Sequence, residues 1–597
     1  MPVGFTSPDA HKPLPRFPAH RRFSGTLGAA CSMAVLSVLP HFTIATTLKW
    51  DADGNPTVGT PVTATPGSGT WSTAAANWYN NTSDIGWTNS STALAQFGGS
   101  GGASGNYSIA VDPSVTTAQG ILFTTDGFKL SGASPVSIAL ATDGVEVDGV
   151  GATIGNNISL GGITKLANDA VAAGTLTLES GSSASSSADM SVTATPGSGA
   201  FTLDVKSGAT LTSGRIVLNS ETKIAGNASF SGTAIFVSST ANANTRLQIS
   251  GAGTVAGTSS TAANGYLQFG PTNAFTGSAT GTLDLDGGTL TVNQIKEGVA
   301  TSQIASTVNL NGGIIKVKTG APNAASFMTG LDTANVKASG AKFDTNNVAT
   351  TVRQPLLHDA GLGTTLDGGL EKLGPGTLTL SGVSTYTGTT TVTTGTLKLT
   401  GTIDASAGIK IASGAVFDLS AKASGYTVNG LSGSGTVAGV QGQSVTLSAN
   451  STLAPGDGAG TLVIGAGNLS LAGGTTYQYE IGGTRLAPTS DRVNLTGPAS
   501  TVSLNSTYAL ALAKLGTIDP TGKTFVLFDS VSPIASAGSW TFDYGTTGWS
   551  GGSVLINPTD NTQVILTSIA VPEPACLSLL LTTGLLITGR RPRRRLA

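Results

Sequence analysis

The middle of the chain is a succession of short runs in which β-branched residues or leucine alternate with polar residues. Each run is bounded by Gly, Asn or Asp; clear examples are FTLDV at 201–205, GTLTL at 376–380 and GTLKL at 395–399. Alternation over about five residues predicts β-strands with one buried face, and the glycine-rich punctuation predicts tight turns between them. Charged residues make up only 10% of the chain and glycines number 82, a composition that would also suit disorder without this alternation. We therefore expect an all-β protein.

The runs also recur at a fixed interval. LDLDGGTLTV at 283–292 reappears as VNLNGGIIKV at 308–317, 25 residues later. A period of this length is typical of a solenoid, in which neighbouring coils complete a core that one coil cannot bury alone. We interpret the repeated Asp and Asn as turn residues that stack in hydrogen-bonded ladders, and the Gly-Gly pairs as positive-φ corners. The repeated Gly-Gly-x-Gly-x-Asp of calcium-binding nonapeptide arrays is absent from this sequence.

One stretch is distinctive enough to suggest a family. Residues 369–399, GLEKLGPGTLTLSGVSTYTGTTTVTTGTLKL, closely resemble the autotransporter-associated β-strand repeat. The resemblance implies a right-handed parallel β-helix of the kind found on secreted surface proteins. STLAPG at 451–456 and TYQYEIG at 476–482 look like segments that follow such repeats. Autotransporters end in a membrane barrel, whereas a different C-terminal segment stands here, so the resemblance implies passenger architecture without self-export.

That C-terminal segment has three parts. A turn of Pro572, Glu573 and Pro574 precedes the uncharged residues 575–589, and an arginine cluster follows at Arg590, Arg591, Arg593, Arg594 and Arg595. As a helix the uncharged part would be about 22 Å long, short of the ~30 Å hydrocarbon core. The pattern resembles the PEP-CTERM sorting signal, which implies cleavage by an exosortase after a transient stop in the inner membrane. A simple C-terminal tail anchor is the alternative.

The N-terminal residues agree with export. Residues 1–24 carry four basic side chains and one acidic one, residues 25–39 are uncharged and mostly apolar, and Thr43-Ile44-Ala45 offers small residues for cleavage after Ala45. We expect a secreted or cell-envelope protein divided into a signal peptide (1–45), an N-terminal β cap (46–130), solenoid repeats (131–476), a C-terminal β region (477–570) and the sorting signal (571–597).

Removal of both signals would remove most of the cysteine and histidine residues from the chain. Both cysteines and three of the four histidines lie in the signals, which leaves His358 alone. We therefore expect no disulfide, no metal site of Cys or His, and no cofactor. The mature chain would keep 21 basic and 30 acidic residues, a net charge of −9, which argues against nucleic acid as a partner.

We expect no catalytic residues and no enzymatic activity. The paired carboxylate patterns of β-helical glycan hydrolases are missing. His358 lies beside Asp359, in what we predict to be a solvated loop, and adjacency in sequence does not make a charge-relay geometry. We interpret Glu371 and Lys372 as an exposed pair at the start of a coil.

Four of the six tryptophans lie near the mature N-terminus, which is where a solenoid needs its open end covered. Trp71, Trp78 and Trp87 have two interpretations: a platform on which sugar rings stack, or a plug that packs on the first coil.

These observations predict an exported structural or adhesive β-solenoid at the cell surface. Its expected partners are the export machinery, an exosortase-type processing enzyme, and exopolysaccharide or neighbouring cells. The alternative is a carbohydrate-binding or glycan-active β-helix passenger.

Overall fold

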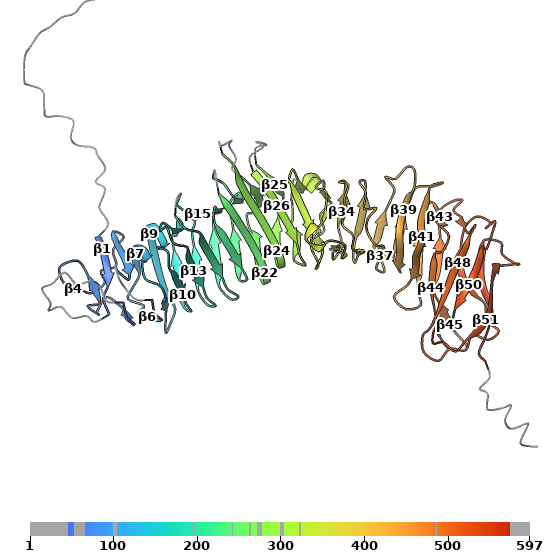
Figure 1. Cartoon of the computed structure of the whole chain (residues 1–597), viewed down its shortest axis with the longest axis horizontal. Helices are drawn as coiled ribbons and strands as arrows, with labels where there is room; N and C mark the ends of the chain where they lie inside the picture. Colours follow the sequence, from blue (N-terminus) through green and yellow to red (C-terminus); the bar gives the residue numbers. More distant parts are fainter. Residues whose placement is uncertain are drawn as a thin grey trace, which may run out of the picture. The chain divides into compact units, whose positions relative to one another are not determined.

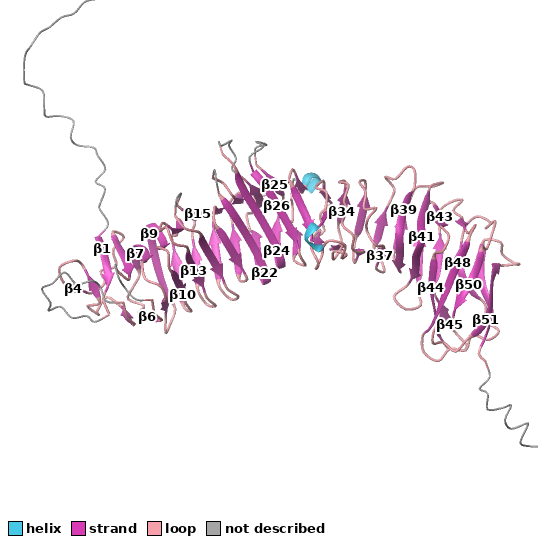
Figure 2. Ribbon diagram, viewed as in Figure 1, coloured by secondary structure: helices cyan, strands magenta, loops and turns pink. Residues whose placement is uncertain are grey.

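The chain divides into two units, residues 1–44 and 45–597. The computed structural model describes residues of the second unit only: 46–52, 66–99, 104–195, 198–240, 243–261, 264–270, 277–298, 304–321, 324–484 and 486–572. These residues form 52 strands and two short 3-10 helices, η1 (Ala324–Ser326) and η2 (Ala360–Leu362) (Figure 2). None of the helices in this part of the chain is long and apolar enough to cross a membrane.

The strands stack in parallel, coil upon coil (Figure 1). For example, β13 (Gly174–Leu178) pairs in parallel with β10 (Gly151–Ile154) before it and with β16 (Phe201–Val205) after it. A partner three strands away means three strands in each coil. Farther along, β34 (Thr377–Leu380) pairs with β36 (Thr396–Leu399), two strands away, so the coils here have two strands. The predicted all-β parallel β-helix is confirmed.

The 25-residue repeat of the sequence sets the register in which successive coils pair. β24 (Ala279–Val292) pairs with β26 (Ile304–Leu310) and β27 (Ile314–Val317), and Leu283 lies opposite Val308 while Val292 lies opposite Val317. Each residue of one copy therefore lies on its counterpart in the next. The Gly-Gly corner is also confirmed, since Gly287 and Gly288 both have positive φ, at 104° and 65°.

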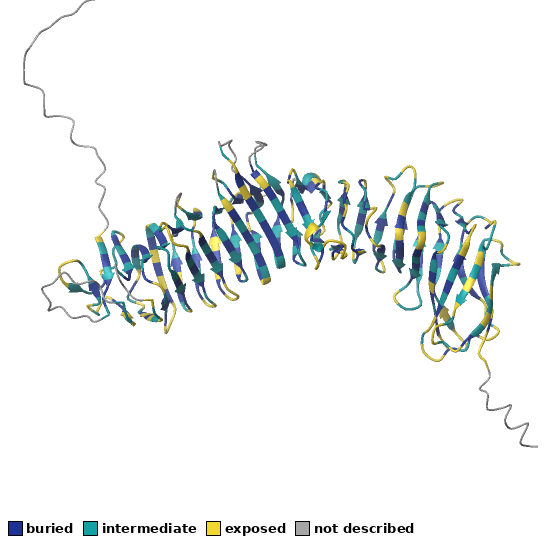
Figure 3. Cartoon of the chain, viewed as in Figure 1, coloured by how far each residue is buried: buried dark blue, intermediate teal, exposed yellow. Residues whose placement is uncertain are grey.

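The core consists of apolar columns that run through the stack, and Figure 3 shows the buried residues as dark blue bands on the strands. Every second residue of a strand points inward, so residues in register pack on one another from coil to coil. One such column is Ile154, Leu178, Val205, Ile224 and Ile249, all of which are buried. Burial of each such side chain contributes about 1.5–3 kcal/mol, which explains why the strands alternate so strictly.

Short antiparallel strands close the N-terminal end. β1 (Thr46–Trp50) pairs in parallel with β5 (Ala93–Phe97) and antiparallel with β3 (Trp78–Tyr79), which pairs antiparallel with β4 (Asp84–Ile85). This edge of the first coil is therefore covered rather than open, as a solenoid terminus requires.

Parallel and antiparallel strand pairs both occur toward the C-terminal end. β44 (Thr476–Gly483) continues the parallel stack onto β48 (Thr507–Lys514), which in turn pairs with β50 (Ser539–Asp543). Beside them, β52 (Gln563–Ala570) pairs antiparallel with β49 (Phe525–Asp529) and with β51 (Ser550–Ile556). The stack thus ends in a small antiparallel sheet.

Candidate functional site

The predicted processing sites fall almost entirely outside the described residues. Pro572 is the last residue that the structure describes, and it is exposed, as is Val571 before it. Glu573, Pro574, the arginine cluster and Ala45 lie outside the described ranges. The polypeptide before the predicted turn is thus accessible, and the sorting signal itself stays a prediction.

The sugar-stacking interpretation of the tryptophans is wrong. Trp71 and Trp78 are completely buried and Trp87 is 2% exposed. Their rings pack on one another with centroids 4.9–5.3 Å apart. A ring whose faces are covered by neighbouring rings offers no surface to a sugar. The other interpretation, a plug on the first coil, agrees with this burial, and the Trp87 indole N–H donates to the carbonyl of Thr117 at 3.0 Å.

His358 has an acidic partner, but the partner is Asp367 rather than the adjacent Asp359. His358 Nδ1 lies 2.8 Å from Asp367 Oδ2, and Nε2 lies 3.1 Å from the carbonyl oxygen of Gly363. Both ring nitrogens therefore face acceptors, which favours the doubly protonated ring. These bonds, led by the one to Asp367, raise the pKa of His358 above its ordinary value.

Asp367 is buried, and several hydrogen bonds fix its carboxylate in place. Its carboxylate accepts hydrogen bonds from the backbone N–H groups of Thr387, Gly388 and Gly369 at 2.7–2.9 Å. Burial by itself raises the pKa of Asp367, but the hydrogen bonds from His358 and from the three backbone N–H groups together outweigh it and lower the pKa overall. The hydroxyl group of Thr387 lies 3.1 Å from His358 Nδ1 and donates to Asp367 Oδ2 at 3.1 Å. The arrangement fastens the exposed loop 359–366 to the coil.

The prediction of an exposed Glu371–Lys372 pair is half wrong. Glu371 faces outward and forms an ion pair with Lys342 at 3.3 Å. Lys372 is completely buried, and its ammonium donates to the carbonyl oxygens of Leu373, Gly374 and Thr394 at 2.6–3.0 Å. Burial lowers the pKa of Lys372 to about 8. The alternation of the strand could have predicted that Lys372 is buried, because Lys372 occupies an inward position two residues after the buried Leu370.

The repeated Asp and Asn residues do form hydrogen-bonded ladders. Asn309 donates to Asp284 at 2.6 Å, and Asn335 donates to Asn309 at 3.0 Å. A second ladder runs from Asn311 to Asp286 at 3.0 Å. The second lies at the predicted corner, whereas the first lies within the strands rather than in turns. Within the described part of the chain, no group of three or more His, Cys, Asp or Glu side chains is placed to hold a metal ion.

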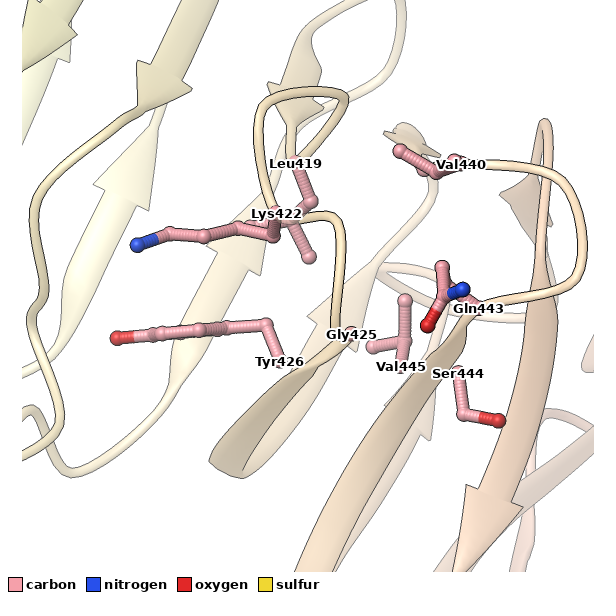
Figure 4. Close-up of a pocket in the computed structure, with 9 residues that line it drawn as sticks. Leu419, Lys422, Gly425, Tyr426, Val440, Gln443, Ser444 and Val445 are labelled. Carbon is pink, nitrogen blue, oxygen red and sulfur yellow. The ribbon is translucent and has the colours of Figure 1, made fainter.

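The hollows on the described surface include three of useful size and a small one. The small one, of about 10 Å³, lies beside Lys422 and Tyr426, whose side chains extend next to each other with the ammonium 5.2 Å from the ring centre (Figure 4). It holds no more than a water molecule. The others have volumes of about 280, 570 and 780 Å³. These are sizes that suit small ligands.

The 570 Å³ hollow is a groove across several coils. Strands β37 (Ile409–Ile411), β39 (Tyr426–Gly433), β41 (Ser444–Pro455), β44 and β48 all contribute residues to it. Two segments singled out in the sequence meet here, STLAPG at 451–456 and TYQYEIG at 476–482. They meet because Leu453 lies opposite Tyr477 in the paired strands β41 and β44. No motif had indicated that these two segments form one surface.

The comparisons with known proteins agree with this architecture. The family model of the passenger-associated transport repeat matches residues 370–399, the stretch that contains Lys372 and Thr387. No curated protein matches the chain. The described region is therefore a parallel β-solenoid that carries a repeat of autotransporter passengers.

Proposed function

We propose that this chain is an exported structural or adhesive β-solenoid of the cell surface or the extracellular space. The observation that carries the proposal is the continuity of the passenger repeat with the stack. β33 (Leu370–Leu373), the first strand of the repeat, pairs with β30 (Ala341–Asp344) before it and with β35 (Thr390–Val392) after it. A passenger repeat built into one long solenoid fits a secreted or outer-surface protein.

The working surface would be the outward rows of small polar residues. Ser159, Ser183, Thr210, Asn227 and Thr254 lie in register on five successive coils. Successive coils lie about 4.8 Å apart, so such a row repeats one hydrogen-bonding group many times at a short interval. Repetition of weak contacts gives high overall avidity without a deep pocket. This is the physical basis of the adhesive role.

Sorting would use the C-terminal segment. The exposed position of Val571 and Pro572 leaves the chain accessible just before the Pro-Glu-Pro turn. We propose that an exosortase-type enzyme cuts at this turn after residues 575–589 have paused in the inner membrane. Mass spectrometry of the protein recovered from its native host tests this step, and a C-terminus that still carries the arginine cluster would refute it.

The adhesive role is tested in cells. Deletion of the gene should reduce aggregation, biofilm formation and surface attachment, and re-expression of the full chain should restore them. Unchanged attachment in the deletion strain would contradict the role.

This proposal assigns the chain no reaction. The one histidine among the described residues has both ring nitrogens engaged, and it fastens a loop. The second candidate function is glycan binding, and the groove formed by residues 451–456 and 476–482 favours it. Screening of the purified protein on immobilised glycans separates simple binding from glycan cleavage, because only cleavage releases shorter products.

A further inference from the structure

The groove has a floor of small side chains. Along one outward row, Lys410 lies opposite Ser432 and Ser432 lies opposite Ala454. In the next coil β44 stacks on β41, and its Gln478 lies opposite Ala511 of β48. Serine and alanine at these outward positions leave space that longer side chains fill elsewhere, so the hollow runs along the stacking direction, across the strands. Its volume is about 570 Å³.

Polar side chains form the rims. Lys410 and Asp457 form an ion pair at 2.8 Å, and the exposed Gln478 and the half-exposed Glu480 also line the hollow. These four residues offer both donors and acceptors of hydrogen bonds. The lysine is already neutralised by its partner, so the rims carry no surplus positive charge that would attract an anion.

The wall made by the turn after β41 is fixed in place. Buried Asp491 accepts hydrogen bonds from the backbone N–H of Gly460 at 2.9 Å and from that of Glu480 at 2.8 Å, and so ties the turn to β44. Gly456 in this turn has a φ of 91°, and a Cβ there would lie 2.1 Å from the carbonyl oxygen of Gly458. The groove is therefore built before any ligand arrives.

We propose that this groove binds a segment of an uncharged polysaccharide. This inference rests on the proposed surface location, because it names the ligand that the solenoid meets there. A pyranose ring has apolar C–H faces and a rim of hydroxyl groups. The alanine methyl groups of the floor fit the faces, while the carboxylate, amide and ammonium groups of the rims pair with the hydroxyls.

A peptide strand fits less well. The strands beneath the groove are already paired on both sides: β41 with β39 and β44, and β44 with β41 and β48. No free strand edge remains in the floor to which a peptide could add by backbone hydrogen bonds. Polysaccharides with acidic groups are disfavoured, because Asp457 balances Lys410 and Glu480 adds a further negative charge.

The test is a binding experiment on the purified secreted chain with immobilised neutral, acidic and amino glycans, followed by calorimetry with the best neutral oligosaccharide. Ala511→Arg should fill the floor and weaken binding about tenfold or more. Gln478→Ala should weaken it through the loss of rim hydrogen bonds. Thr177→Arg is the matched control, since Thr177 is also an outward strand residue and lies beside Thr153 and Asp204 just as Ala511 lies beside Gln478 and Asp543.

Circular dichroism and thermal unfolding would confirm that each variant is folded. Neutral-glycan binding that Ala511→Arg abolishes and Thr177→Arg preserves supports the proposal. Absence of neutral-glycan binding, preference for acidic glycans or peptides, self-association through this face, or equal binding by Ala511→Arg overturns it. None of these failures would alter the mass of the processed chain or the attachment of cells, so the proposed surface role is judged separately.

Discussion

Lys372 is a buried ammonium group whose three hydrogen bonds all go to carbonyl oxygens in the turns of adjacent coils. Burying a charge is costly unless hydrogen bonds replace the lost water, and here they do. The side chain thus links Leu373 and Gly374 in one coil to Thr394 in the next. In a stack of coils with few charged residues, one such contact holds two turns at a fixed separation.

Replacing Lys372 with Met should therefore destabilise the repeat region. The carbonyl oxygens lose their buried donor, and the expected loss is about 1–3 kcal/mol in the free energy of unfolding. Urea denaturation and hydrogen exchange of residues 370–399 would measure it. Lys398→Met is the control, because Lys398 faces outward in an ion pair with Asp418 at 3.3 Å and should change stability by less than about 0.5 kcal/mol. Equal effects of the two substitutions would show that Lys372 has no special structural role.

His358 should titrate at a higher pH than a free imidazole. Its pKa is raised by the bond to Asp367 and the bond to Gly363, so the protonated ring stabilises the fold. That stabilisation is fully present below the ordinary histidine pKa of about 6.5, and it is lost as the pH rises through the higher folded value. NMR titration of the mature chain would follow this single imidazole directly. A titration at or below the ordinary value would contradict the observed contacts, and Asp367→Asn should shift the pKa downward.

Within strands, the ladders join neighbouring coils by side chains as well as by backbone. Asn309 donates to Asp284 and accepts from Asn335, so it stands between two coils in a continuous chain of hydrogen bonds. An amide suits this place because it is both donor and acceptor, whereas a carboxylate only accepts.

Asn309→Asp should consequently destabilise these coils in a pH-dependent way. At neutral pH two carboxylates would lie against each other and Asp284 would keep Arg246 but lose the amide donor of residue 309, with an expected cost of about 1–3 kcal/mol. At low pH one carboxyl regains a proton and part of the loss should disappear. Unfolding followed by circular dichroism at both pH values checks this, with Asn309→Leu as a variant whose effect should not depend on pH. A pH-independent loss in Asn309→Asp would count against the ladder.

The strands themselves were largely predictable. Alternation in residues 201–205 and 376–380 predicted their inward and outward faces, and the 25-residue repeat predicted their register. Contacts across the stack were not predictable in this way. Asp367 reaches His358 because the loop between them folds back, and Lys372 meets Thr394 because coils stack, 22 residues apart along the chain. The groove could not be predicted from the sequence for the same reason, since its two segments meet only through pairing of β41 with β44.

At the scale of the whole described unit, each coil contacts its immediate neighbours. Stability in such a stack is close to a sum of coil terms and nearest-neighbour terms. A defect in one coil should therefore spread only a short way. The buried tryptophans of the N-terminal cap and the passenger repeat at 370–399 are separated by many coils and should behave independently.

Trp71→Ala tests this independence. It removes a fully buried ring that packs against Trp78 and Trp87, at an expected cost of about 3–5 kcal/mol. Hydrogen exchange monitored by mass spectrometry should show faster exchange in the first coils and unchanged protection in residues 370–399. Loss of protection along the entire chain would instead mean that the solenoid unfolds as one cooperative block.

The exact 25-residue offset between Leu283 and Val308 has an evolutionary consequence. Loss of residues 284–308 would join Leu283 directly to Asn309, and every later residue would still meet an equivalent partner one coil earlier. Unequal recombination between the two copies would therefore lengthen or shorten the protein by one whole coil at a time. Natural selection can adjust how far such a molecule extends without having to redesign its interior.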